Sequence, residues 1–199
     1  LLESFARLRI AVVGDFCLDR YLEIDPDHRE LSIETGLPVY KVDRVRAQPG
    51  AAGTVLNNLA ALGVGALLPV GFCGDDGEGF ELERCLRTMP AVSLDAFQRT
   101  ALRRTFTYCK PLLVRDGHAP VELNRLDSKN GTPTPRALQD SLASAICNLR
   151  GTVDAVVVMD QVDVHGTGVI SAPVLEALAG LALEIPVLAD SRNGFRAYP

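Results

Sequence analysis

The chain has 199 residues, 47% of them hydrophobic, which is enough for one domain with a well-packed core. Because 25 acidic residues stand against 20 basic ones, the net charge is −5, and the basic residues form no stripe. This pattern argues against nucleic-acid binding. No apolar run reaches the roughly 20 residues of a membrane span, so we expect no membrane partner.

The five cysteines are widely spaced, and no Cys-x-x-Cys pair occurs among them. An odd number at such spacing is typical of a reducing compartment, so we expect a cytoplasmic protein without a disulfide framework. The three histidines stand far apart in the sequence, and none has the spacing of a metal ligand. The sequence therefore predicts no protein-bound metal site.

Strand and helix patterns alternate along the first half of the chain. The predicted elements are, in order, a buried strand over 8–15, half-exposed strands over 21–25 and 38–47, a helix over 49–64, a buried strand over 65–74 and a helix over 76–89. Asp76 is the predicted N-cap of the last of these, with Glu78 favoured in its first turn by the helix dipole. The alternative is that the glycines of GDDGEG serve a close backbone approach.

The second half continues the alternation. Its predicted elements are a strand over 92–97, a hairpin of 103–114 and 119–127 turning at Arg115-Asp116-Gly117, a helix over 133–149, a buried strand over 154–160, a helix over 171–184 and a strand over 186–190. We expect Thr134 to cap the first of these helices, with Pro135 at its first position, and Ser171 to cap the second.

Continuous apolar strands that alternate with helices predict an α/β fold with a doubly wound, mostly parallel sheet. The strands near 20–47 and 103–127 alternate apolar and polar residues, so we expect them to form a small β lid beside that sheet. Polar residues follow four of the buried strands, and the carboxyl ends of parallel strands meet at one edge. These residues are Asp15 and Asp19, Asp75 and Asp76, Asp160 and Asp163, and Asp190, Arg192 and Asn193. Such carboxylates bind sugar hydroxyls or hydrated Mg²⁺, or they are ordinary polar loop residues.

Two nucleotide-binding motifs are missing. No Gly-Lys pair occurs, which excludes a P-loop, and GFCGDDG does not match the Gly-x-Gly-x-x-Gly fingerprint of dinucleotide-binding enzymes. A nucleotide-dependent oxidoreductase is therefore the weakest of the functional hypotheses.

Seven segments, taken in their order along the chain, resemble the ribokinase (PfkB) family of sugar kinases, and within it the heptose-7-phosphate kinase domain of lipopolysaccharide heptose biosynthesis. The segments are VVGDFCLDRY, PVYKV, PGAAGTVLNNLAALG, VGFCGDDGEG, NRLD, DAVVVMD and PVLAD. The resemblance implies that residues 1–199 are the N-terminal part of one ribokinase-like domain. It also implies that the C-terminal part of the fold lies outside this chain.

The resemblance also implies the site residues. Asp19 matches the acid that binds substrate hydroxyls, Gly50 the first glycine of the family pair, and Asn58 the family asparagine inside the helix. Lys110 matches the basic residue that faces a substrate phosphate, and Asp160 the acid that ends its strand.

Several positions depart from the family pattern. The second glycine of the pair is Ala51, and the sugar-binding asparagine falls at Thr54, which offers a single hydroxyl. The turn after Asp160 has no lysine, and the Asp-Pro-Lys-like turn is Asp190-Ser191-Arg192, implied here as the nucleotide contact.

Two functional hypotheses follow. In the first, the intact protein is a carbohydrate kinase that uses ATP and Mg²⁺ on a sugar or sugar phosphate, and this chain is its substrate-binding part. The family's catalytic base belongs to a Gly-Ala-Gly-Asp segment expected beyond residue 199, so the chain alone is expected to be inactive; the lid is expected to form a homodimer contact. In the second, the chain is a non-catalytic carbohydrate-binding module, or a kinase-like module completed by a partner.

Overall fold

The fold is built on a parallel sheet, seen in a computed structural model that describes residues 2–194, 196 and 198, without the side chains of residues 2, 3, 28 and 29. Within these residues, five parallel strands lie in the order β10-β9-β1-β4-β5. Their bounds are β1 Arg9–Gly14, β4 Ala66–Gly74, β5 Phe97–Thr100, β9 Ala155–Asp160 and β10 Val187–Ser191. Central β1 is buried from Ile10 onward, as its continuous apolar run predicts.

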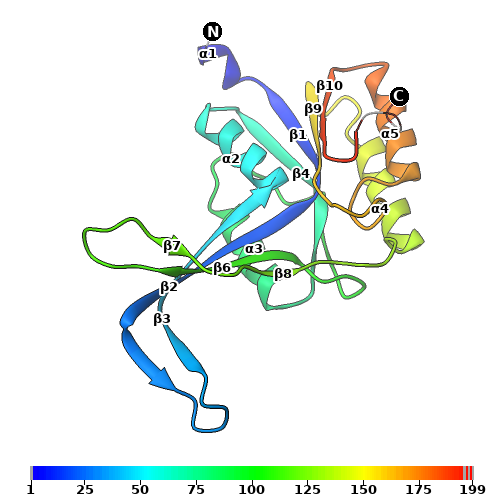
Figure 1. Cartoon of the computed structure of the whole chain (residues 1–199). Coiled ribbons are helices and arrows are strands. Elements are labelled where there is room, and N and C mark those ends of the chain that lie inside the picture. Colours follow the sequence, from blue (N-terminus) through cyan, green and yellow to red (C-terminus); the bar gives the residue numbers. More distant parts are fainter. Residues whose placement is uncertain (1, 195, 197, 199) are drawn as a thin grey trace.

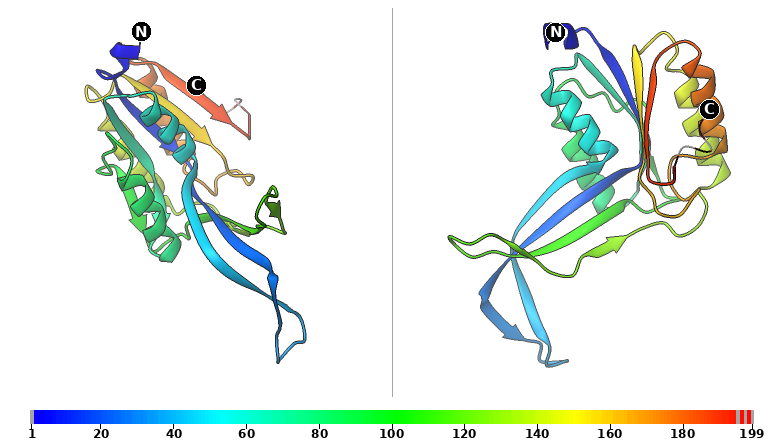
Figure 2. Two further views of the ribbon diagram at one scale, coloured as in Figure 1. Left: turned by 90° about the vertical axis from the view of Figure 1, so that its left-hand side faces the viewer. Right: turned by 45° about the horizontal axis from the view of Figure 1, so that its top comes forward.

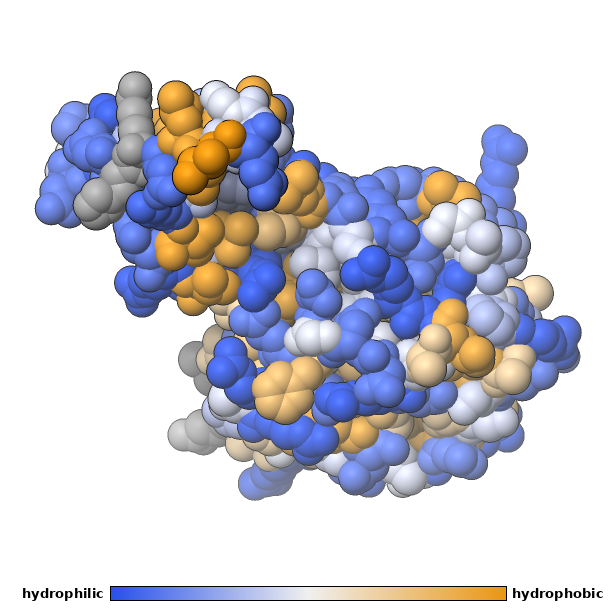
Figure 3. Space-filling view, turned by 90° about the horizontal axis from the view of Figure 1, so that it is seen from below, coloured by the Kyte–Doolittle hydropathy of each residue, from blue (hydrophilic) through white to orange (hydrophobic). Residues whose placement is uncertain are grey.

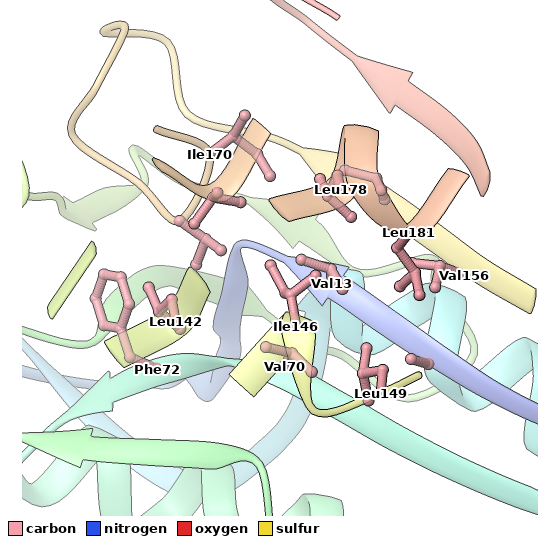
Figure 4. Packing of buried hydrophobic residues seen from close by; sticks show 14 of the residues in the cluster. Val13, Val70, Phe72, Leu142, Ile146, Leu149, Val156, Ile170, Leu178 and Leu181 are labelled. Atoms are coloured by element: carbon pink, nitrogen blue, oxygen red, sulfur yellow. The ribbon is translucent and has the colours of Figure 1, made fainter. Parts of the chain in front are cut away.

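Helices cover both faces of this sheet (Figure 1). On one face, α2 (Ala52–Ala61) and α3 (Gly77–Arg87) pack against β1 and β4. On the other, α4 (Arg136–Cys147) and α5 (Ala172–Ala182) bury Leu142, Ile146, Leu178 and Leu181 against the sheet (Figure 4). The short α1 (Leu2–Phe5) precedes β1. The doubly wound α/β prediction is confirmed, and no described helix has the length and apolar character needed to cross a membrane.

A second sheet projects from this body as a lid (Figures 1 and 2). It consists of β2 (Phe16–Leu31), β3 (Pro38–Ala51), β6 (Phe106–Leu113), β7 (Val121–Glu122) and β8 (Leu126–Ser128). Strand β2 follows β1 after a single residue. It pairs antiparallel with β3 and parallel with β6. The inner ends of β2 and β3 are therefore fixed to the body, whereas the hairpin between them extends into solvent.

The outer hairpin of the lid exposes large apolar side chains. Leu31, Leu37 and Tyr40 are more than half exposed, and Ile33 is fully exposed. Figure 3 shows apolar surface among polar surface on the projecting lobe. The hairpin is thus held by its strand pairing and not by burial in a core of its own.

Three local predictions have different outcomes. Asp76 does cap α3, because its Oδ1 accepts from Gly79 N at 2.8 Å. Thr134 does not cap α4, because its hydroxyl is buried and donates to Gly168 O at 2.7 Å, and Pro135 takes the N-cap position. Ser171 holds the N-cap position of α5 but makes no cap bond. Pro173, in the first turn after it, has no N–H to offer.

The strand predicted over 92–97 is misplaced. Strand β5 begins at Phe97, and the earlier segment makes a single bridge between Val92 and Leu67. The hairpin predicted at Arg115-Asp116-Gly117 is confirmed, because β6 and β7 pair antiparallel across it and Gly117 has φ +75°. A short apolar segment in the sequence indicates that its residues are buried, but it does not indicate which of them pair with a neighbouring strand.

Candidate active site

A cavity of about 310 Å³ lies where the lid meets the carboxyl edge of the parallel sheet. Its lining combines the inner ends of the lid strands with the segments that follow β9 and β10. The lining residues are Cys17, Asp19, Ala51, Tyr108, Lys110, Arg125, Lys129, Gln161, Asp163 and Arg192. Four residues of the predicted site, Asp19, Ala51, Lys110 and Arg192, therefore line one cavity.

Asp19 and Lys110 form an ion pair in the wall of this cavity. Lys110 Nζ lies 2.7 Å from Asp19 Oδ1 and 3.4 Å from the Tyr21 hydroxyl, and the two charged side chains are 18% and 16% exposed. Burial alone would lower the pKa of Lys110, but the hydrogen bond and charge of Asp19 outweigh it, so this pKa is raised. Lys110 therefore keeps its charge at neutral pH.

The main chain at Gly50 and Ala51 runs directly against this pair. A Cβ at Gly50 would lie 2.5 Å from Asp19 Oδ2 and 2.7 Å from Cys17 Sγ, so a larger residue would displace the acid. Ala51 has φ 52° and ψ −117°, a conformation that favours glycine. The small residues before α2 thus allow the backbone to approach Asp19 and the cavity.

Four cations line the cavity of a chain whose net charge is negative. Besides Lys110, they are Arg125, Lys129 and Arg192. Lys129 Nζ lies 2.6 Å from Asp163 Oδ2, and Arg192 Nη1 lies 3.8 Å from Asp163 Oδ1. Arg125 is held by Asp127 at 2.6 and 2.8 Å.

An aromatic ring orients two of these cations. The Tyr108 ring lies 4.7 Å from the Arg125 guanidinium carbon and 5.4 Å from Lys129 Nζ. With its amide oxygen turned toward Arg192, Gln161 accepts from that guanidinium at 2.9 Å. The arrangement is suited to an anionic ligand.

Sequence reasoning missed several residues of this lining as ligand contacts. Tyr108, Arg125, Lys129 and Gln161 were not predicted, and Asp163 was noted only as an acid after a strand. The one signal that pointed to them is the segment NRLD, which contains Arg125 and Asp127 beside β8. Charge alone did not distinguish these residues from other lid cations.

The other predicted residues lie outside the cavity lining as described. Thr54 and Asn58 lie on the exposed side of α2. Asp160 is 4% exposed and accepts from Ser191 Oγ at 2.7 Å and from Asn193 Nδ2 at 3.2 Å. Asp190 is exposed at the end of β10. Asp160 thus joins the ends of neighbouring strands β9 and β10, and its role toward a ligand stays a prediction.

The described residues contain no group of three or more His, Cys, Asp or Glu side chains placed to hold a metal ion. Asp15 is bonded to main-chain amides and Asp76 to α3 and Thr105, so both are engaged within the fold. Burial alone would raise the pKa of Asp76, but hydrogen bonds from Thr105 and Gly79 outweigh it and lower this pKa.

Comparison with known proteins agrees with this fold. No protein-family model matches the chain. Bifunctional protein HldE from Gluconobacter oxydans is 31% identical over 201 residues, which cover all of this chain and 40% of that protein. A D-beta-D-heptose 7-phosphate kinase from Bordetella bronchiseptica is 31% identical over 191 residues, which cover 96% of this chain and 56% of that protein.

Solved structures give the same architecture. Arabidopsis thaliana ribokinase, complexed with ribose and ATP, aligns over 93% of this chain and 54% of its own, with a TM-score of 0.57 at 19% identity. The chain has the ribokinase fold. Escherichia coli phosphofructokinase-2 in complex with fructose-6-phosphate aligns over 92% of this ribokinase-like chain and 55% of its own, with a TM-score of 0.58 at 13% identity. The chain thus spans between about a third and somewhat more than half of the relatives that it matches.

Proposed function

We propose that the protein containing this chain is a kinase that transfers a phosphoryl group from Mg-ATP to a hydroxyl of a sugar phosphate, and that the cavity beside the lid holds the acceptor. The observation that carries the proposal is the half-buried Asp19–Lys110 pair in a cavity rich in cations. The sequence relative and the structural neighbours that support this proposal are named as sugar or sugar-phosphate kinases.

The proposed roles follow from the chemistry of each group. The Asp19 carboxylate accepts hydrogen bonds from two sugar hydroxyls, while Lys110 donates to the acceptor and holds Asp19 in place. The small residues Gly50 and Ala51 let the sugar ring lie close to the start of α2. Thr54 and Asn58, on the exposed side of that helix, are proposed to contact the part of the acceptor that extends beyond the cavity.

A phosphorylated acceptor is favoured over a neutral sugar. Arg125, Lys129 and Arg192 bring three further positive charges to the cavity lining, whose one further acid is Asp163; Asp127, which is not in the lining, pairs with Arg125. Guanidinium and ammonium groups bind phosphate by charge-assisted hydrogen bonds, whereas a neutral sugar gains little from them. We therefore propose heptose 7-phosphate, after the Bordetella relative, as the first acceptor to test.

The donor contacts are proposed on fewer observations. Asp190 lies near the end of β10, and Arg192 follows that strand and lines the acceptor cavity. These two residues fit a role where the donor's terminal phosphate meets the acceptor. The described residues do not fit a Mg²⁺ site, and we derive no step through the metal. We propose no catalytic base among residues 1–199, so this chain is proposed to bind the acceptor without transferring phosphate by itself.

Two proposals concern the surroundings of the protein. The wide spacing of the cysteines, none of which forms a disulfide in the described residues, supports a cytoplasmic protein. The exposed apolar residues of the outer lid hairpin support a homodimer contact with a second copy of the lid.

The test is a substrate panel with the intact natural polypeptide that contains residues 1–199. Purified protein is incubated with Mg-ATP and with heptose 7-phosphate, fructose 6-phosphate, ribose or heptose, and ADP release is measured. The proposal predicts that phosphorylated acceptors give the largest kcat/KM. Binding of the same sugars without ATP-dependent transfer would instead favour the non-catalytic or partner-completed module. The intact mass of the native polypeptide, compared with 21.4 kDa, shows whether it extends beyond this chain.

A further inference from the structure

Asp15 lies just behind the cavity, at the single residue between β1 and β2. It is 2% exposed and contributes nothing to the cavity lining. Its Oδ2 accepts from the main-chain N–H of Gln161 at 2.8 Å and of Val162 at 3.2 Å, and its Oδ1 accepts from that of Val169 at 2.7 Å. One carboxylate thus binds both ends of the segment 161–169, which we call the β9–α5 loop.

The main chain of Asp15 binds two further elements. Its N–H donates to Met159 O at 3.0 Å, at the end of β9, and its C=O accepts from Ala52 N, the first residue of α2, at 3.0 Å. The loop and the α2 start are both fixed to this residue. The two walls of the cavity, at Ala51 and at Gln161, are therefore held by one amino acid.

Gly168 shows how tightly the loop closes on the carboxylate. A Cβ at this position would collide with Asp15 Oδ1, and it would lie 2.9 Å from Asp15 Cγ and 2.9 Å from Val162 Cγ2. Only glycine leaves room for the Asp15 side chain between the two ends of the loop.

The loop carries groups of the cavity. Gln161 and Asp163 line it, and Asp163 is the acid that meets Lys129 and Arg192. The amides of Gln161, Val162 and Val169 lie in irregular backbone, so the carboxylate takes the place of a strand partner.

We propose that Asp15 is a positioning residue that fixes the β9–α5 loop, and through it Gln161 and Asp163, relative to the cations of the acceptor cavity. The effect on the acceptor rests on the proposed function, whereas the fixing of the loop does not.

Other ionisable groups face Asp15. Burial raises the pKa of Asp15 to about 6, against the hydrogen bonds from Val169, Gln161 and Val162, and the Asp160 charge adds to the rise. The pKa values of Cys17 and Tyr198 are also raised. Burial is the largest cause for both groups, and the Asp15 charge contributes. At pH 7.5, where the test is made, Asp15 is ionised and accepts all three bonds.

Hydrogen exchange of the backbone amides in the intact protein tests the inference without a ligand. Asp15→Ala removes both carboxylate oxygens, and exchange at Gln161, Val162 and Val169 is expected to become at least tenfold faster, while amides of β4 keep their rates. Asp15→Asn keeps one acceptor oxygen and is expected to restore part of the protection. The matched control is Asp154→Ala, at the opposite end of β9, whose carboxylate binds Arg9 N at 2.8 Å. It is expected to leave the loop amides unchanged.

A double-mutant cycle separates positioning from general stabilisation. The cycle compares the effect of Gly168→Ala on loop exchange in the wild type and in Asp15→Ala. If Asp15 and Gly168 act through the same loop, the effect in Asp15→Ala is expected to be less than half of that in the wild type. The heptose 7-phosphate dissociation constant, measured for Asp15→Asn, is expected to rise at least fivefold. Unchanged loop exchange in Asp15→Ala, equal acceleration in β4, or additive effects in the cycle would each overturn the inference. If the wild type binds no heptose 7-phosphate, the proposed function is contradicted. Faster loop exchange in Asp15→Ala would in that case still support the positioning role of Asp15.

Discussion

The body and the lid are both β-sheets, yet different forces hold them. In the body, β1 and β4 are buried between two helix layers, and their side chains are apolar on both faces. In the lid, the outer parts of β2 and β3 leave apolar side chains in solvent, and backbone pairing holds the strands. Burial therefore determines the body. The lid lacks such a core, and we propose that a ligand binds at its inner end and a second copy at its outer end.

The largest expected effect of a single substitution lies in the body. Leu142 of α4 is fully buried against the sheet, so Leu142→Ala leaves a cavity and should lower the free energy of unfolding by about 2–5 kcal/mol. Chemical denaturation measures this value. The same truncation at Leu37 of the lid hairpin should change it by less than about 0.5 kcal/mol. Equal effects at the two positions would remove the distinction between body and lid.

A pH titration examines the junction between the two regions. The folded pKa of Asp15, about 6, exceeds its ordinary value of 3.8, so the folded state binds a proton that the unfolded chain releases. The favourable contribution of protonated Asp15 is complete below about pH 4 and is lost as the pH rises through 6. The stability of the wild type relative to Asp15→Asn should therefore fall by up to about 3 kcal/mol from pH 4 to pH 7.

The comparison with Asp15→Asn cancels the groups that titrate in the opposite direction. Asp76, for example, whose pKa is lowered, is present in both proteins, and its contribution is lost as the pH falls. Urea unfolding at several pH values gives the difference directly. A difference that stays constant, or that grows with pH, would contradict the account of Asp15 as a buried carboxylate.

A smaller effect is expected at the cavity backbone. Ala51 adopts φ 52°, and replacing it with glycine removes this strain, so Ala51→Gly should raise the free energy of unfolding by about 1 kcal/mol or less. Ala91, with φ 64° in an exposed turn, is the matched control for glycine away from the cavity. If Ala51→Gly stabilises the protein and leaves acceptor binding unchanged, the strain has no role in the site. A loss of affinity would show that the cavity wall needs the Ala51 side chain.

The smallest effect on the free energy of unfolding is expected at the outer hairpin of the lid. Ile33→Ser should leave the free energy of unfolding within about 0.5 kcal/mol of the wild type, because Ile33 is fully exposed. In sedimentation experiments the same change should weaken a concentration-dependent dimer. A protein that is monomeric at all concentrations before the substitution would contradict the proposed homodimer contact.

The same contrast explains what the sequence can predict. Strands β1, β4 and β9 were located from apolar runs because burial leaves that pattern, whereas the edge strand β5 was misplaced. Asp76 was assigned as a cap from local signals alone. Thr134 was assigned wrongly because its hydroxyl binds Gly168, a tertiary contact with no local signature.

The candidate site was predicted in part for a related reason. Asp19, Lys110 and Arg192 were assigned from the family resemblance and line the cavity, whereas Tyr108, Arg125 and Lys129 were missed. Their side chains reach the cavity because β6 pairs with both β2 and β8, segments that lie far apart in the sequence. No spacing or periodicity in one strand reports such a pairing.

The central claim is that the cavity at the inner end of the lid binds the acceptor. Its most direct test is the KM of heptose 7-phosphate and of ATP for Asp19→Asn and Lys110→Met in the intact protein. The account predicts that the acceptor KM rises about 10- to 100-fold, because a charged hydrogen bond is lost, while the ATP KM changes less than threefold. Equal changes in both constants, or no change in either, would contradict it.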